Sequence, residues 1–160
     1  MEKELKVGIS DYKIGEAPQS LFTIGLGSCV GIAIYDPTTR VGGLSHIMLP
    51  DSSMFNGEKK IEKFADLAIP HMVSELAKKT PKRRLVAKIA GGSSMFKNSL
   101  NTPQANIGLR NVAAVETILK QQGIPILANH TGGSMGRSMF FDLHTLEVKV
   151  RMGNREVFDL

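Results

Sequence analysis

The stretch that organises this sequence is Thr23-Ile24-Gly25-Leu26-Gly27-Ser28-Cys29, which is followed by an apolar run, Val30–Tyr35. It contains the single cysteine of the chain, placed directly after a Gly-x-Gly-Ser segment. A second apolar run follows a short polar segment and carries His46. A cysteine and a histidine on two adjacent extended segments can form a nucleophile and its base, so the relative placement of these two residues decides how the sequence is interpreted.

The size and composition of the chain are those of an ordinary globular domain. It has 160 residues, of which 42% are hydrophobic and 22% are charged, so it can bury a core and we expect residues 1–160 to form a single domain. The first residues, Met1–Lys6, are charged and unlike a secretory signal. No apolar run approaches the roughly 20 residues of a membrane span. We therefore expect a soluble cytoplasmic protein without membrane insertion.

Charge and cysteine content exclude several classes of function. The net charge is +5, and a mildly basic surface suits an acidic protein partner or a nucleic acid about equally. The absence of Trp and the 6% aromatic content leave few platforms for base stacking, which argues against nucleic acid. One cysteine excludes an internal disulfide and a multi-thiolate metal site. The histidines show no metal-ligand spacing either, so no metal is expected.

The register of one predicted hairpin decides whether Cys29 and His46 can meet. The segment Asp36–Thr39 is a typical turn sequence. If these four residues form the loop, Tyr35 lies opposite Arg40 and Cys29 lies opposite His46. Directly opposed residues share a face with Cβ atoms about 4.5–5.5 Å apart, which permits a sulfur–nitrogen hydrogen bond. A five-residue loop would place the two side chains on opposite faces, and the sequence does not fix the loop length.

The remaining pattern predicts more strands than helices. Val30, Ile32 and Ile34 are expected to face the core. Pro70 should kink its helix or start a second one, and Asn106 can cap the other helix. Several strands form sequential hairpins, which predicts an α/β layered sandwich with mixed, largely antiparallel sheets. The strands are expected at Lys6–Ile14, Ser20–Ile24, Cys29–Tyr35, Arg40–Leu49, Leu85–Ala90, Ile124–Asn129, Met139–Leu143 and Glu147–Met152, and the helices at Lys59–Lys79 and Asn106–Gln122.

Cys29 has two interpretations, a small buried hydrophobic residue and a nucleophile. The glycines of Gly25-Leu26-Gly27 let the backbone approach a ligand closely, and the backbone N–H groups of Ser28 and Cys29 can form an oxyanion hole. His46 can deprotonate the thiol or pair with the thiolate and lower its pKa. Thr23 can orient the imidazole through its hydroxyl or backbone, although Thr is also common in strands.

Other glycine-rich segments and histidines give weaker signals. Gly91-Gly92-Ser93 and Gly132-Gly133-Ser134 are expected to be turns that line the cleft, with anion-binding nests as the alternative. The Gly25-x-Gly27 pair lacks the third glycine and the following helix of a dinucleotide-binding loop. His130 is a candidate for a position near the site because it precedes the second glycine pair.

Taken together, these motifs resemble the CheD family, the chemoreceptor glutamine deamidases of bacterial and archaeal chemotaxis. The resemblance covers nearly the whole chain. It implies that the family's catalytic Cys, His and Thr fall on Cys29, His46 and Thr23, and that the fold is similar to the deamidase domain of the cytotoxic necrotizing factor toxins. It rests on Gly25-Leu26-Gly27-Ser28-Cys29-Val30-Gly31, Tyr35-Asp36-Pro37, Gly43–Pro50, Ile89-Ala90-Gly91-Gly92, Met95-Phe96, Ile107-Gly108, Arg110-Asn111, Gly132-Gly133 and Gly136-Arg137.

The resemblance also implies a reaction and partners. It implies hydrolysis of specific glutamine side chains to glutamate on the cytoplasmic helical bundle of a chemoreceptor, through a thioester on Cys29 and with no metal or organic cofactor. Some family members resemble methylesterases that act on glutamyl methyl esters. The alternative is a main role in regulated binding to CheC, the phosphatase of the response regulator CheY, with catalysis secondary.

Overall fold

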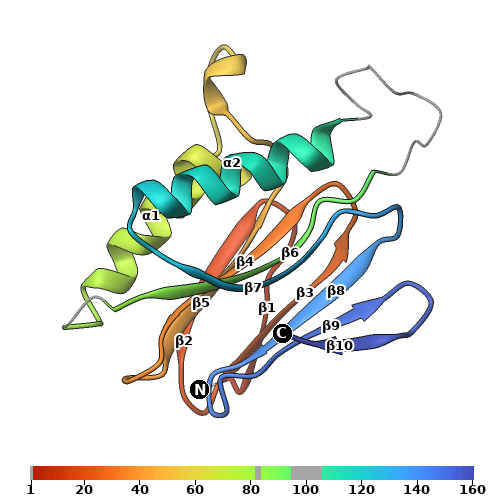
Figure 1. Ribbon diagram of the computed structural model, residues 1–160. Coiled ribbons are helices and arrows are strands. Elements are labelled where there is room, and N and C mark those ends of the chain that lie inside the picture. Colours follow the sequence, from red (N-terminus) through yellow and green to blue (C-terminus); the bar gives the residue numbers. More distant parts are fainter. Residues whose placement is uncertain (1, 82–83, 95–105) are drawn as a thin grey trace.

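The computed structural model describes residues 2–81, 84–94 and 106–160. The Met95-Phe96 part of the family motif lies outside these residues. Helices α1 (Ala65–Ala77) and α2 (Ile107–Gln121) lie side by side over one sheet, and a second sheet packs against the other face of that sheet (Figure 1). Two short 3₁₀ helices, η1 (Ser52–Met54) and η2 (Ile61–Lys63), precede α1.

The sheet beneath the helices, called the inner sheet, and the second sheet, called the outer sheet, each contain five strands in the described residues. Within them β1 with β3 and β6 with β7 pair in parallel, and the other pairs are antiparallel. This arrangement confirms the predicted α/β class with mixed, largely antiparallel sheets. The inner order is β2 (Asp11–Glu16), β5 (Val41–Ile47), β4 (Val30–Asp36), β6 (Val86–Gly91), β7 (Ile126–Thr131), and the outer order is β1 (Glu4–Lys6), β3 (Ser20–Leu26), β8 (Arg137–Asp142), β9 (Val148–Met152), β10 (Val157–Asp159).

Strand β4 is buried along its whole length because a layer covers each of its faces. Val30, Ile32 and Ile34 pack into the core between the inner sheet and the helices, as predicted. Ala33 and Tyr35 pack into a second core between the two sheets. The side-chain period of two therefore sends alternate residues of one strand into two different cores.

The β4–β5 hairpin has a four-residue loop, but not the predicted one. Asp36 pairs with Val41, so the loop is residues 37–40 and the predicted pairing of Cys29 with His46 is wrong. Asp36 terminates the strand because its carboxylate accepts a hydrogen bond from the Thr38 N–H at 2.8 Å and its carbonyl accepts one from the Arg40 N–H at 2.9 Å. Arg40 closes the turn with a φ of 58°. Both strand ends moved by one residue, so the faces of the strands are unchanged.

The predicted first strand, Lys6–Ile14, is two strands in different sheets. The chain leaves the outer sheet after β1 and enters the inner sheet at β2. Ser10 makes this crossing with a φ of 57°, and its N–H donates to the carbonyl of His46 at 2.9 Å. The alternation of apolar residues continues through the crossing, so the sequence pattern did not reveal the break between the two strands. Strand β10 was not predicted at all.

Helix α1 begins later than predicted, and helix α2 begins without the expected cap. The first turns of the predicted Lys59–Lys79 helix are η2 and an extended Phe64 that bridges to Leu49, so α1 starts at Ala65. Pro70 lies inside α1 and does not divide it. Asn106 precedes α2 but makes no side-chain capping hydrogen bond. Among the helices of the described residues, none combines the length and hydropathy needed to cross a membrane.

Candidate active site

Cys29 lies in a short bend between β3 and β4 that is held by three neighbours. The carbonyls of three consecutive residues each accept one hydrogen bond: Gly27 from the Ser93 N–H, Ser28 from the Asn111 side chain, and Cys29 from the Gly92 N–H, at 2.8–2.9 Å. The donors come from the end of β6 and from α2. The bend is therefore fixed from the side of the inner sheet, and the freedom expected of its glycines is limited to Gly25, which has a φ of 75°.

The Cys29 side chain is half-buried beside the core between the two sheets. Burial raises the pKa of its thiol, and a hydrogen bond from its own backbone N–H opposes this rise. This direction is opposite to the lowering that pairing of a thiolate with His46 would give, and it leaves deprotonation by His46 as the other predicted role. The thiol is neutral at neutral pH, and it needs a base to become a nucleophile.

His46 is completely buried on β5 and points between the sheets, where Thr23 of β3 contacts it. The Thr23 Oγ1 lies 2.6 Å from the Nδ1 of His46 and donates its own proton to the Val7 carbonyl at 2.7 Å. A hydroxyl has one proton to donate. Because that proton is used on Val7, Nδ1 must carry a proton and donate it to Thr23, which leaves Nε2 as the basic nitrogen.

Cys29 and His46 project from the same face of the inner sheet. Gly31 is the direct partner of His46, and Cys29, in the bend before β4, packs against the core on the same side of the sheet. A Cβ at Gly31 would lie 2.8 Å from the Met139 sulfur and 3.1 Å from Leu26, so this face is the one between the sheets. Diagonal neighbours lie about 7–8 Å apart, which long side chains can bridge. The thiol and the imidazole therefore lie on the same side of the inner sheet, where the residue of β4 opposite His46 is a glycine.

The free nitrogen of His46 is suited to accept a proton. In the described part of the structure, its Nε2 is buried and has no hydrogen-bond partner. Burial lowers the pKa of His46 to about 4, so the imidazole is neutral at neutral pH. A neutral thiol and a neutral imidazole with one defined basic nitrogen form the resting state of a general-base mechanism, in which the proton moves as sulfur attacks.

Asn111 of α2 supports the site, and this role was not predicted from the sequence. It is completely buried, and its Nδ2 donates to the carbonyls of Ser28 and Met48, each at 2.9 Å. These two carbonyls belong to the Cys29 bend and to the residue after β5. Asn111 thus holds together the chain segments that carry the thiol and the imidazole. The sequence pattern that could have indicated this role is a single polar residue on the apolar helix face formed by Val115, Ile118 and Leu119.

The two glycine turns lie next to the Cys29 bend. The Gly132 N–H donates to the Gly91 carbonyl and the Ser94 N–H donates to the Gly133 carbonyl, at 3.0 and 2.8 Å. The turns therefore support one another and the bend. His130 makes different contacts: its Nδ1 accepts a hydrogen bond from Arg137 at 2.9 Å and its ring packs on Phe158 at 4.7 Å. Burial and the Arg137 charge lower its pKa.

The oxyanion donors and metal ligands can be assessed from the same geometry. Among the described residues, the Ser28 N–H makes no hydrogen bond to a protein acceptor, so it is a free donor next to Cys29. Searched over the same residues, no group of three or more His, Cys, Asp or Glu side chains has the arrangement of a metal site. The chemistry available here is that of a thiol, an imidazole and backbone donors.

Comparison with known proteins gives a consistent result. Residues 48–152 match the family model described as CheD chemotactic sensory transduction. Proteins named "Probable chemoreceptor glutamine deamidase CheD" match most of the chain. The relative from Clostridium kluyveri is 51% identical over 97% of this chain and 98% of its own length. Those from Desulforamulus reducens and Moorella thermoacetica are 49% and 50% identical over 92% and 93% of this chain and 90% of their own lengths.

Proposed function

The chain belongs to the CheD family, and from this premise we propose that it hydrolyses glutamine side chains of chemoreceptors to glutamate, with Cys29 as the nucleophile and His46 as the base. The observation that carries the assignment is the hydrogen-bonded series Val7 carbonyl, Thr23 hydroxyl, His46 Nδ1. It fixes the tautomer that leaves Nε2 basic on the face shared with Cys29. Thr23 acts as the residue that orients the base.

The first half of the reaction forms a thioester. The Nε2 of His46 takes the thiol proton as the Cys29 sulfur bonds to the carboxamide carbon of the glutamine, and the carbonyl oxygen becomes an oxyanion. The free Ser28 N–H and the Cys29 N–H are the donors for that oxyanion. As the tetrahedral intermediate collapses, the imidazolium returns its proton to the leaving nitrogen, and ammonia departs.

The second half releases glutamate. Water occupies the place vacated by ammonia, and Nε2 takes one of its protons as the oxygen attacks the thioester carbon. Collapse of the second intermediate breaks the carbon–sulfur bond, and the imidazolium reprotonates the sulfur. The pair returns to its neutral state. The balance is one glutamine and one water consumed, and one glutamate and one ammonia formed.

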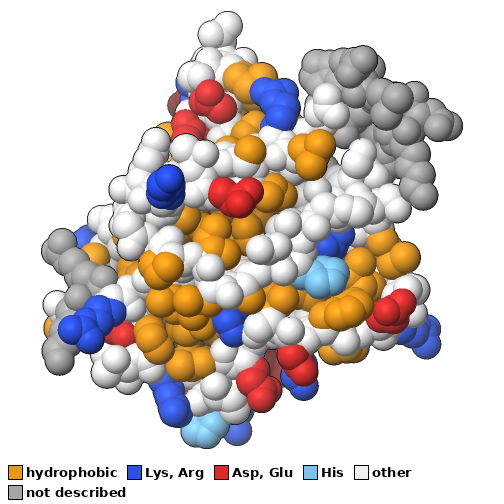
Figure 2. Space-filling view, viewed as in Figure 1, with side chains coloured by type: hydrophobic (Ala, Val, Ile, Leu, Met, Phe, Trp, Pro, Cys, Tyr) orange, Lys and Arg blue, Asp and Glu red, His pale blue; other side chains and the backbone are white. Residues whose placement is uncertain are grey.

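The surface near the site fits a protein substrate better than a small amide. Met48, next to the Cys29 bend, is 37% exposed, and Met54 and Phe55 of the projecting η1 segment are 56% and 42% exposed. Hydrophobic side chains are visible on this projecting segment beside charged ones (Figure 2). Exposed Met and Phe side chains are typical of protein contact surfaces. We propose that this surface receives the receptor bundle.

The test is the intact mass of a recombinant chemoreceptor cytoplasmic fragment after incubation with the protein. Each deamidation replaces an NH₂ group by OH, and the mass rises accordingly. Cys29→Ala and His46→Ala should both abolish the rise. A Cys29→Ala protein that still produced the rise would exclude Cys29 as the nucleophile. A glutamyl methyl ester in the same fragment tests the methylesterase reaction, which the same acyl-enzyme supports.

A second candidate function is regulated binding of CheC, favoured by the same exposed Met and Phe side chains. CheC would then occupy the face around Cys29 as a mimic of the receptor. A Cys29→Ala protein that binds CheC and restores chemotaxis to a strain lacking the gene would make binding the main role. We also propose kinship of the layered fold with the deamidase domain of the cytotoxic necrotizing factor toxins, which superposition of the Cys–His strands would test.

A further inference from the structure

A pocket with a volume of about 660 Å³ opens beside the segment that leads to Cys29. The residues that line it include Arg137, Arg151 and Arg155, together with Gly25 and Gly153. None of the residues that line it is acidic. Gly25 is the part of the pocket nearest to Cys29 in the chain, since only Leu26, Gly27 and Ser28 separate the two.

The positive charge of this pocket is not neutralised within the described residues. None of its three arginines forms an ion pair with these residues. The ion pair found among them joins His71 and Glu75. Arg137 is 4% exposed, and its guanidinium donates to neutral acceptors, the carbonyls of His130, Gly132 and Met135. Arg137 precedes Ser138, the partner of Arg151 on β9, so its guanidinium lies on the other face of the outer sheet, between the two sheets. An anion that enters the pocket therefore meets the exposed Arg151 and Arg155 directly.

Of the two exposed arginines, Arg151 has an ordered side chain and Arg155 lies in an anchored turn. The Arg151 guanidinium lies over the Phe140 ring, 5.1 Å from its centre. Arg155 lies in the β9–β10 turn, which is attached to the β8 side because the Gly153 N–H donates to the Gly136 carbonyl at 3.0 Å. Ordered guanidinium groups lose less entropy when they bind a carboxylate, and they can do so with two parallel hydrogen bonds.

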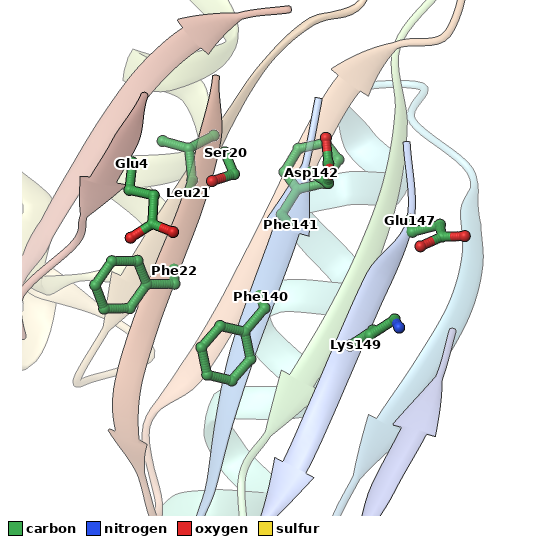
Figure 3. Close-up of a pocket in the computed structure, with 9 residues that line it drawn as sticks. All are labelled: Glu4, Ser20, Leu21, Phe22, Phe140, Phe141, Asp142, Glu147 and Lys149. Carbon is green, nitrogen blue, oxygen red and sulfur yellow. The ribbon is translucent and has the colours of Figure 1, made fainter. Parts of the chain in front are cut away.

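The basic character is local and does not extend along the outer sheet. A second pocket of about 480 Å³ on the same sheet is lined by Glu4, Asp142, Glu147 and Lys149 together with aromatic side chains. Figure 3 shows these charged groups around the neighbouring Phe22 and Phe140 rings. Lys149 lies two residues before Arg151 on β9 and lines only this second, mainly acidic pocket. The outer sheet thus carries a basic pocket near Cys29 and a separate, mainly acidic pocket farther along its strands.

We propose that Arg151 and Arg155 of this pocket bind a carboxylate side chain of the protein substrate, within about two helical turns of the target glutamine. This inference rests on the deamidase function proposed above. Four residue steps from Gly25 to Cys29 span at most about 14 Å, and two turns of a substrate helix rise about 11 Å. A helical substrate with its glutamine at Cys29 can therefore reach the pocket with an acidic residue one or two turns away.

The test uses a recombinant chemoreceptor cytoplasmic fragment and the inactive Cys29→Ala protein, so that binding is measured without turnover. Arg151→Glu and Arg155→Glu should each weaken the calorimetric Kd by about tenfold or more, the scale of one lost charge-assisted contact. Lys149→Glu is the matched control and should change the Kd by less than about twofold, as for an exposed rim charge. Both arginines are exposed, so these variants are expected to fold.

A second arm identifies the contacted group. Asp and Glu residues within two turns of the modified glutamine are changed to Ala in the fragment, singly. One of these changes should weaken binding to the Cys29→Ala protein as much as Arg155→Glu does. The same change should not weaken binding to the Arg155→Glu protein any further. This non-additivity is the signature of a direct pair in a double-mutant cycle. In active protein, the arginine variants should raise KM and leave kcat unchanged.

Three results overturn the proposal: the fragment fails to bind the Cys29→Ala protein, the arginine variants bind it as well as the parent does, or Lys149→Glu weakens binding as much as they do. The failure of the proposed function is a different result. If wild-type protein gives no mass rise while binding still depends on Arg151 and Arg155, deamidation is excluded and the carboxylate pocket stands.

Discussion

Thr23 and His46 come from different sheets, and the Oγ1 of one lies 2.6 Å from the Nδ1 of the other. Thr23 is on β3 of the outer sheet and His46 is on β5 of the inner sheet. Both are completely buried. The orientation of the base is therefore a consequence of how the two sheets pack, and it depends on the core between them.

Replacing Thr23 by Val should lower activity through this contact. The side chains have nearly the same shape, but Val leaves the buried Nδ1–H of His46 without an acceptor. Leaving such a group unpaired costs about 1–3 kcal/mol, which corresponds to a loss of about tenfold to hundredfold in kcat if it falls on the transition state. The measurement is the initial rate of receptor-fragment deamidation by mass.

The Thr23→Ser protein is the control because it keeps the hydroxyl. It should retain nearly wild-type kcat, and urea unfolding should show that both variants are folded at the assay temperature. Equal rates for the Val and Ser variants would show that the hydroxyl does not orient His46.

The pH dependence of activity should reflect the pKa of His46, which burial lowers to about 4. Because neutral His46 is the base, kcat/KM should stay level from pH 8 to pH 6 and should halve only near pH 4, whereas an ordinary histidine would give a midpoint near pH 6.5. A midpoint at or above 6.5 would contradict a buried neutral base.

The same lowered pKa affects stability, with a defined sign. Below pH 6.5 the unfolded chain binds a proton at residue 46 that the folded protein excludes. The free energy of unfolding should therefore fall by up to about 3 kcal/mol between pH 6.5 and pH 4. Urea unfolding at several pH values measures this slope. His46→Asn keeps an N–H for Thr23 and cannot titrate, so a slope that persists in that variant belongs to other groups.

The hairpin shows what could be predicted from sequence and what could not. The strands around Asp36 and the side chains on each face of β4 were predictable from alternation and turn composition. The pairing was not, because a four-residue loop can start at either Asp36 or Pro37, and the hydrogen bonds of Asp36 decide between them. Both starts keep Cys29 and His46 on one face, since each strand shifts by one residue. The conclusion about the faces survived an error in the register.

The contacts between layers lay beyond sequence reasoning for a different reason. Asn111 and Thr23 each join elements that are far apart in the chain, and local periodicity carries no information on which layers meet. The split of the predicted Lys6–Ile14 strand has the same origin, since the crossing at Ser10 is stabilised by a hydrogen bond to His46. The reaction class came from the motif around Cys29, whereas the support of the site came from tertiary packing.

Asn111→Leu should show how far the bend depends on α2. The substitution keeps the number and branching of the side-chain heavy atoms but removes the two donors to Ser28 and Met48, so two buried carbonyls lose their partners. We expect a loss of about 2–4 kcal/mol in the free energy of unfolding and a fall in kcat larger than that of Thr23→Val. Asn56→Leu, at an exposed position, is the control and should change the free energy of unfolding by about 0.5 kcal/mol or less. A fully active and stable Asn111→Leu protein would show that the bend holds its shape without α2.

Gly91→Ala should be among the most damaging small substitutions in the chain. A Cβ at Gly91 would lie 2.3 Å from the Cys29 carbonyl oxygen, and the residue has a φ of 112°. The methyl group therefore pushes directly on the nucleophile's own backbone while the φ angle is strained.

Gly123→Ala separates the two effects, because Gly123 has a φ of 72° but nothing within 4 Å of the added Cβ. Gly123→Ala should cost about 1–2 kcal/mol of stability from strain and leave kcat unchanged. Gly91→Ala should cost more stability and also lose deamidation, and Cys29 alkylation by iodoacetamide should change in rate. If the two variants had equal stability and activity, the close approach of Gly91 to Cys29 would have no role in placing the thiol.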